Sequence, residues 1–222
     1  TLMVMAVNPQ KESALLFNIP RDTRTRIAGR GIQDKINHAY AYGGVKMSIE
    51  TVEDFLDVPI EYYAKVNMQG FARIVDALGG VEVDNPFAFE YGGHTFKEGL
   101  IHLDGDAALK YTRMRYEDPR GDLGRNERQR LVLKAMIKKA ASPATFTNLG
   151  TVLESLGSSV TTNITFDEMK KLGSEYRDVL WRVETLEIKG RGQKINGIYY
   201  LIVSDEEKKR IRFLVKKQLE QG

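Results

Sequence analysis

The chain has 222 residues, an ordinary apolar share of 42% and a formal net charge of +3. This length suffices for one domain with a sizeable core, and so slight a positive balance does not indicate a polybasic, histone-like protein. The absence of cysteine excludes disulfides, cysteine-ligated zinc and thiol nucleophiles. The positive charge is local, because ten of the sixteen arginines lie within residues 21–30 and 113–130.

The first half of the chain alternates between expected strands and helices. Residues 2–7 and 13–19 are apolar runs joined by a polar turn, which predicts a β-hairpin. Strands are also expected over 60–66 and 81–83. An amphipathic helix precedes the first of these, between the glycines at 43 and 44 and Pro59, and a second helix over 71–78 separates them. A hairpin or irregular stretch continues to about residue 99.

The second half begins with a short helix from Asp104 to about Tyr111. A long helix runs to about residue 141, where Ser142 and Pro143 stop it, and another helix is expected over 143–158. Thr165 and Glu168 form a predicted capping box, and Ser204 caps a basic C-terminal helix. Strands are expected over 181–188 and 198–203.

This alternation predicts an α/β fold, an α-β-α sandwich with a mixed central sheet. We expect one domain over residues 1–222, with 142–143 as the only plausible boundary. The chain opens inside an expected strand, and no apolar run reaches the roughly 20 residues that span a bilayer. We therefore expect it to be a fragment whose N-terminal part, with any membrane anchor, is missing.

Residues 111–130 hold six arginines, at positions 113, 115, 120, 125, 128 and 130. Arg113 and Arg115 are two apart, which predicts an extended segment with both side chains on one side. Pro119 and Gly121 predict a turn, and Asp122 is placed to cap the next helix. Arginine forks, free helix amides and the positive end of the helix dipole all suit a phosphate or pyrophosphate.

The long helix carries a stripe at i, i+4, i+7 and i+11 formed by Arg125, Gln129, Val132 and Met136. The stripe is polar in its first turn and apolar afterwards, which predicts an anion site at the mouth of an apolar, lipid-binding pocket. The alternative is a solvated surface, on which nearby carboxylates pair with the arginines. These carboxylates belong to Glu117, Asp118, Asp122 and Glu127.

Two positions in the first arginine stretch are further candidates. Asp22 follows an expected strand and could hold magnesium, which takes one or two carboxylates plus phosphate oxygens and waters. It could equally pair with Arg21 or Arg24. Arg30 lies between two glycines, so its backbone can approach a ligand closely. Asp122 could also act as a base on an incoming hydroxyl.

Several stretches, in this order, resemble the LytR-CpsA-Psr family of cell-wall glycopolymer ligases. They lie at residues 18–23, 35–44, 71–81, 103–115 and 121–130. The resemblance is dense over residues 1–141 and looser afterwards. It looks closest to the members that attach wall teichoic acid in Gram-positive bacilli.

The resemblance implies a transferase with one N-terminal membrane helix and an extracellular catalytic domain. Such enzymes move an anionic glycopolymer from a polyprenyl pyrophosphate carrier to a peptidoglycan sugar hydroxyl, forming a phosphodiester. By this resemblance, Asp22 falls in the motif linked to Mg²⁺, and Asp122 matches an acidic residue near the phosphates. The family has another acidic residue just before the position of Thr1, outside this chain. The residues matching the pyrophosphate ligands are Arg30, Arg113, Arg115, Arg125 and Gln129.

Three other functions stay open. A polyprenyl pyrophosphate phosphohydrolase would use the same site with water in place of the sugar hydroxyl. A nucleic-acid-binding regulator would use the arginine clusters, although the sequence shows no basic recognition helix and only a small net charge. A passive lipid-binding scaffold would bind the carrier without turnover.

Overall fold

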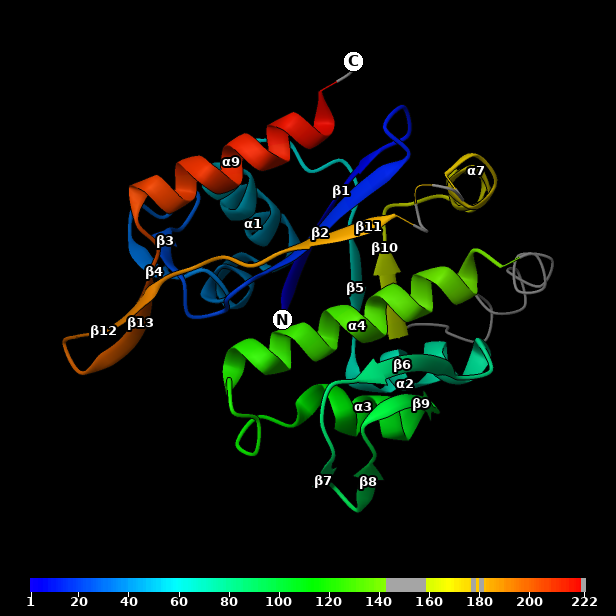
Figure 1. Cartoon of the computed structure of the whole chain (residues 1–222). Coiled ribbons are helices and arrows are strands. Elements are labelled where there is room, and N and C mark those ends of the chain that lie inside the picture. Colours follow the sequence, from blue (N-terminus) through cyan, green and yellow to red (C-terminus); the bar gives the residue numbers. More distant parts are fainter. Residues whose placement is uncertain (143–158, 177–178, 180–181, 221–222) are drawn as a thin grey trace. The chain divides into compact units, whose positions relative to one another are not determined.

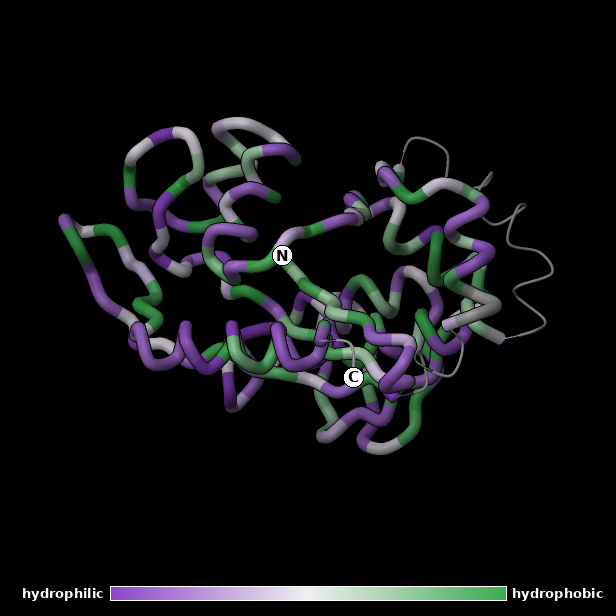
Figure 2. The backbone as a smooth tube through the Cα atoms, turned by 90° about the horizontal axis from the view of Figure 1, so that it is seen from above, coloured by the Kyte–Doolittle hydropathy of each residue, from purple (hydrophilic) through white to green (hydrophobic). Residues whose placement is uncertain are grey.

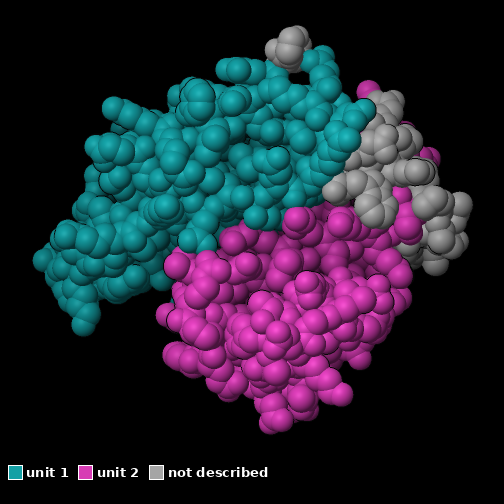
Figure 3. All heavy atoms as spheres, viewed as in Figure 1, with its two compact units in different colours: residues 1–61, 182–222 teal, residues 62–181 magenta. Residues whose placement is uncertain are grey.

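The computed structural model describes residues 1–142, 159–176, 179 and 182–220. Its contacts divide the chain into two compact units (Figure 3): unit 1 comprises Thr1–Glu61 and Arg182–Gly222, and unit 2 comprises Tyr62–Trp181. The divisions therefore fall at 61/62 and 181/182, whereas residue 142 lies inside unit 2. The single domain over 1–222 stays a prediction, and the helix expected over 143–158 lies outside the described residues.

Unit 1 is built on a three-stranded mixed sheet (Figure 1). Strands β1 (Leu2–Asn8) and β2 (Ser13–Ile19) form the predicted antiparallel hairpin, and β11 (Val183–Leu186) pairs parallel with β2. The sequence placed this last strand over 181–188. The α/β class with a mixed sheet is thus confirmed.

Helices α1 (His38–Leu56) and α9 (Asp205–Leu219) pack against each other, and α9 also packs on β1 and β2. Helix α1 begins before the expected position, because one helical turn precedes a kink at the two glycines. The Ser204 side chain caps α9 as predicted, by accepting from the Glu207 N–H. The core of unit 1 joins residues of these helices to the sheet, among them Phe17, Phe55 and Ile211.

Two small hairpins complete unit 1. Strands β3 (Arg24–Arg26) and β4 (Gln33–Lys35) enclose Arg30, and β12 (Arg191–Ile195) pairs with β13 (Ile198–Ile202). Strand β12 was not predicted from the sequence, although Asn196 and Gly197 form a strong hairpin signal. Both adopt positive φ, 51° and 81°, as a tight turn of this kind requires.

Unit 2 contains α2 (Met68–Ala77), α3 (Gly105–Arg113) and α4 (Asp122–Ala140). Helix α3 packs against both α2 and α4, and α4 also contacts β6. The capping box of α7 (Phe166–Glu175) is present as predicted. The strands of unit 2 form three antiparallel pairs. They are β6 (Val81–Asn85) with β9 (Gly99–Leu103), β7 (Phe89–Tyr91) with β8 (His94–Phe96), and β5 (Ala64–Val66) with β10 (Val160–Thr162).

The strand predicted over 60–66 is shorter in the structure and covers only β5. Side chains, not a neighbouring strand, satisfy the earlier backbone donors. The Ile60 N–H donates to Glu53 Oε1 at 2.8 Å, and the Tyr63 N–H donates to Asn163 Oδ1 at 2.8 Å.

The helices of both units contain both hydrophilic and hydrophobic residues. Hydrophilic and hydrophobic residues alternate along them (Figure 2), as expected when one face is buried and the other solvated. Among the described residues no helix combines the length and the apolar character needed to cross a bilayer.

Candidate functional site

The second arginine stretch occupies the end of α3, the loop over 114–121 and the start of α4. Arg113 is the last residue of α3 and Arg115 lies in the loop, so the predicted extended segment with both on one side is wrong. Asp104 caps the start of α3, by accepting from the Ala107 N–H at 2.8 Å. Arg113 is exposed and forms no ion pair with any described residue.

The start of α4 also differs from the prediction. Gly121 is the N-cap, with a φ of 56° that disfavours a side chain, and Asp122 is the first helical residue without a capping hydrogen bond. Its carboxylate faces two arginines: Oδ1 lies 2.6 Å from Arg125 Nη2 and 3.5 Å from Arg115 Nε. Asp122 therefore brings Arg115 and Arg125 together at the positive end of the helix dipole.

Gln129 lies one turn beyond Arg125 on α4. Its Nε2 donates to the carbonyl of Thr112 at 3.3 Å. Thr112 is the residue directly before Arg113. Unit 2 thus places all four predicted pyrophosphate ligands of this stretch at the junction between the end of α3 and the start of α4. The assignment of these residues to pyrophosphate itself stays a prediction.

The alternative of internal pairing holds for other members of the stretch. Arg120 pairs with Glu127 on the surface, and Arg128 pairs with Asp118 in the interior. The Arg128 and Asp118 side chains are only 2% and 3% exposed. Burial with Asp118 makes Arg128 unavailable as an anion ligand, whereas the exposed pair with Glu127 does not exclude Arg120.

The apolar residues of the α4 stripe, Val132 and Met136, are buried in the core. Val132 and Met136 are 0% and 7% exposed and belong to the unit 2 core with Tyr111, Phe89 and Leu103. Burial raises the pKa of Tyr111 to about 12, as expected for a phenol surrounded by core side chains. The predicted lipid pocket is therefore not seen along these two residues, and it stays a prediction.

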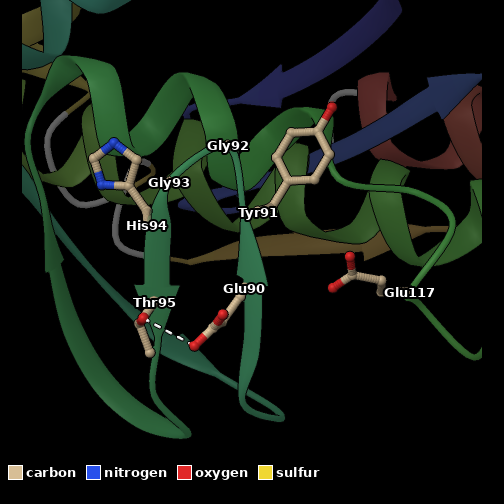
Figure 4. A pocket seen from close by; sticks show the side chains of 7 residues that line it. All are labelled: Glu90, Tyr91, Gly92, Gly93, His94, Thr95 and Glu117. Atoms are coloured by element: carbon tan, nitrogen blue, oxygen red, sulfur yellow. Dashed lines mark hydrogen bonds between the residues drawn. The ribbon is translucent and has the colours of Figure 1, made fainter.

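A pocket of unit 2 lies between the β7–β8 hairpin and the loop of the arginine stretch (Figure 4). Glu90 and Glu117 line it, together with Tyr91, His94 and Thr95, and Thr95 Oγ1 donates to Glu90 Oε1 at 3.3 Å. Two carboxylates at its wall would repel a diphosphate. This pocket is therefore unsuited to the anion predicted from the arginines.

In unit 1 the guanidinium of Arg30 lies over the ring of Tyr42, 4.5 Å from its centroid. The Tyr42 hydroxyl donates to Asp34 Oδ2 at 2.6 Å, and His38 Nδ1 lies 2.8 Å from the same oxygen. Burial raises the pKa of Asp34, but hydrogen bonds from Tyr42, His38 and the Lys35 N–H outweigh it and lower the pKa to about 2. Asp34 is thus an ionised anchor for the ring that supports Arg30, and the sequence analysis missed it.

Asp22 pairs mainly with Lys35, a partner that was not predicted from the sequence. Lys35 Nζ lies 2.7 Å from Oδ1, and Arg21 Nε lies 3.5 Å from Oδ2. Thr23 Oγ1 and Asn37 Oδ1 nearby are buried oxygens without a hydrogen-bond partner among the described residues. The Asn37 N–H donates to the Arg21 carbonyl at 3.3 Å, which places it beside this strand end.

These oxygens fit magnesium only in the mode that needs one protein carboxylate plus substrate phosphates and waters. Within the described ranges no three acidic or histidine residues form a metal-binding group. Asp22 and Arg30 belong to unit 1, whereas the other predicted ligands belong to unit 2. Their convergence on one diphosphate stays a prediction from the sequence.

Comparison with known proteins places the chain in a family. A sequence model of the LytR_cpsA_psr family matches residues 1–217. The polyisoprenyl-teichoic acid--peptidoglycan teichoic acid transferase TagU of Halalkalibacterium halodurans is 52% identical over 221 residues, which cover 99% of this chain and 73% of that protein.

Two solved structures share the fold across nearly the whole chain. Bacillus subtilis TagU is 45% identical with a TM-score of 0.83, over 100% of this chain and 92% of that one. A protein of Enterococcus faecalis described as a transcriptional regulator is 38% identical with a TM-score of 0.91, over 98% of this chain and 81% of that one. The chain belongs to the LytR-CpsA-Psr family, so the resemblance inferred from the sequence is confirmed.

Proposed function

We propose that this chain is a transferase that attaches wall teichoic acid, an anionic glycopolymer, to peptidoglycan. The donor is the polymer on a polyprenyl pyrophosphate carrier, and the acceptor is a peptidoglycan sugar hydroxyl. The observation that carries the proposal is the grouping of Arg115, Asp122 and Arg125 at the start of α4. Among relatives, the teichoic acid transferase named above supports it, since the two sequences are 52% identical over 221 residues.

The reaction is a phosphoryl transfer, which depends on positioning and charge neutralisation. The acceptor hydroxyl oxygen attacks the phosphorus that carries the glycopolymer. The bond from this phosphorus to the bridging oxygen of the diphosphate breaks, and polyprenyl phosphate leaves with the electron pair. Arginine forks contact the phosphate oxygens and offset the charge that develops on the leaving group.

Asp122 is the proposed acceptor of the hydroxyl proton. In the structure its carboxylate is engaged by two guanidinium groups. A bound diphosphate takes over these guanidinium contacts, because it offers more negative charge and more acceptor oxygens than one carboxylate. The freed carboxylate then faces the incoming hydroxyl.

Magnesium is the proposed cofactor, with Asp22 as its carboxylate ligand. Bound there, it would offset negative charge on the diphosphate. Lys35 contacts one oxygen of this carboxylate, Oδ1, at 2.7 Å. The buried oxygens of Thr23 and Asn37 support a polar site at this strand end.

We further propose that the protein works at the outer face of the cell membrane of a Gram-positive bacterium. A single N-terminal anchor, outside this chain, would hold it there. This location follows from the chemistry, because a polyprenyl carrier lies in the membrane and peptidoglycan lies outside it.

Substitution of Arg113 tests the proposed function. Arg113→Ala should abolish or strongly weaken both carrier binding and transfer, because Arg113 is an exposed guanidinium at the α3–α4 junction. Unchanged binding and transfer would contradict the assignment. If the polymer leaves as a free phosphate, not as a phosphodiester on peptidoglycan, the protein is the phosphohydrolase.

A nucleic-acid-binding regulator is the second candidate, favoured by the description of the Enterococcus faecalis protein. Filter binding to DNA over a range of salt concentrations separates the two, since phosphate contacts give a steep salt dependence. The proposed transferase should show no such binding.

A further inference from the structure

The acidic residues of the arginine stretch differ in burial. The Asp118 side chain is 3% exposed, whereas that of Asp122 is 34% exposed. A buried ion pair costs several kcal/mol of desolvation unless its geometry and hydrogen bonds offset that cost. The pair of Asp118 and Arg128 is therefore unlike a surface ion pair, and its hydrogen bonds show which parts of the chain it holds in place.

Arg128, on α4, ties together three parts of the segment before it. Its Nε donates to the Tyr111 carbonyl at 3.1 Å, Nη2 donates to the Met114 carbonyl, and Nη1 donates to Asp118 Oδ2. The guanidinium also lies over the Phe89 ring, 5.4 Å from its centroid. The two carbonyls end α3, where unsatisfied acceptors and the negative end of the helix dipole favour a cation.

Asp118 holds the loop from its other side. Its Oδ1 accepts from the Arg120 N–H at 2.7 Å, and its carbonyl accepts from the Gly121 N–H at 2.9 Å. Its own N–H donates to the Arg115 carbonyl at 3.4 Å. The first turn of α4 leaves room for this carboxylate only because residue 124 is glycine, since a Cβ there would lie 2.0 Å from Asp118 Oδ2.

We propose that the buried pair of Asp118 and Arg128 positions the loop so that Arg113 and Arg115 face the same diphosphate as Arg125. This inference rests on the proposed function. The held Met114 carbonyl lies between Arg113 and Arg115, and Arg128 is three residues beyond Arg125 on the same helix. Asp118 and Arg128 are positioning residues that do not contact the diphosphate.

The test measures the affinity of the whole chain for inorganic pyrophosphate by calorimetric titration. Asp118→Asn removes the buried charge and keeps the side-chain shape. We expect it to weaken the affinity at least tenfold. Two controls are matched to it: Glu127→Gln makes the same carboxylate-to-amide change in an exposed pair, and Leu103→Ala lowers stability through the unit 2 core. Both should keep the wild-type affinity within about twofold.

Amide hydrogen exchange gives a second measure that a merely stabilising pair would not move in the same way. In Asp118→Asn the Arg120 and Gly121 amides should exchange faster than in Leu103→Ala at an equal loss of melting temperature. Should Asp118→Asn fail to fold, Arg128→Lys and Gly124→Ala replace it. The first keeps the charge without the fork, and the second displaces the carboxylate while both partners remain.

The outcomes separate the two proposals. If the wild type does not bind pyrophosphate, the proposed function fails and this inference fails with it. If the wild type binds and Asp118→Asn binds equally well, or loses no more affinity than Leu103→Ala, only the positioning role is overturned. The positioning role is supported if Asp118→Asn selectively loses affinity for pyrophosphate and Arg128→Lys keeps part of that affinity.

Discussion

At the residue scale, Asp122 is an internal competitor for the anion that the site is proposed to bind. Its carboxylate contacts the guanidinium groups of Arg115 and Arg125. The contact with Arg125 is partly buried, since the Arg125 and Asp122 side chains are 15% and 34% exposed. Its value in the proposed mechanism is that the same carboxylate becomes available when the diphosphate arrives.

Asp122→Asn should therefore separate binding from turnover. Without the competing charge, the affinity for inorganic pyrophosphate should rise about threefold or more. The transfer rate should fall by about 10² to 10⁴, the usual contribution of general acid–base catalysis. Titration and single-turnover transfer measure the two effects, and weaker pyrophosphate binding would contradict the competition. Glu127→Gln is again the matched control.

Asp34 makes a prediction about pH. Its folded-state pKa is lowered from 3.8 to about 2, so its contribution to the free energy of unfolding is fully present above about pH 4 and is lost as the pH falls toward 2. The difference in melting temperature between the wild type and Asp34→Asn should shrink over this window. Asp54→Asn, a change at an exposed carboxylate, should show no such trend. A constant difference for Asp34→Asn would refute the ionised anchor.

At the element scale, the parts of the chain specified by local chemistry were predictable. The β1–β2 hairpin, the capping box of α7 and the Ser204 cap of α9 all follow from side chains and backbone within a few residues of each other. The two helix ends in the arginine stretch were not. Asp122 resembles an N-cap in sequence, but Gly121 takes that position because the chain enters α4 with positive φ.

A similar reason limits what the sequence alone says about the arginine stretch. A pattern of arginines shows which side chains carry charge, but not which of them the fold buries. Arg128 and Arg125 are equally basic and lie three residues apart on one helix, yet burial against Asp118 removes Arg128 from the candidates. That distinction depends on contacts between α4, the loop and α3, which a single-sequence pattern does not contain.

The capping box of α7 can be tested by itself. Thr165→Ala removes the side chain that accepts from the Glu168 N–H and should lower the free energy of unfolding by about 1 kcal/mol. Thr161→Ala, on an exposed strand position, should have a smaller effect. Denaturant unfolding measures both. An equal effect of the two substitutions would show that the cap contributes nothing.

At the scale of the whole molecule, the central question is whether arginines of the two units act on one anion. Arg30→Ala and Arg113→Ala should each weaken pyrophosphate binding by about 10- to 100-fold, as expected when a charged hydrogen bond is lost. Arg191→Ala makes the same charge change at an exposed arginine outside both clusters, and it should leave the affinity unchanged. If Arg30→Ala also leaves it unchanged, the diphosphate is bound by unit 2 alone.

The most direct test of the account is the fate of the glycopolymer. The protein is incubated with polyprenyl pyrophosphate-linked teichoic acid and peptidoglycan, and the phosphorus-containing products are identified by ³¹P NMR. We predict a phosphodiester between polymer and peptidoglycan together with free polyprenyl phosphate, and far less of both products with Arg113→Ala. Polymer released as a free phosphate monoester, or equal products from Arg113→Ala, would contradict the transferase.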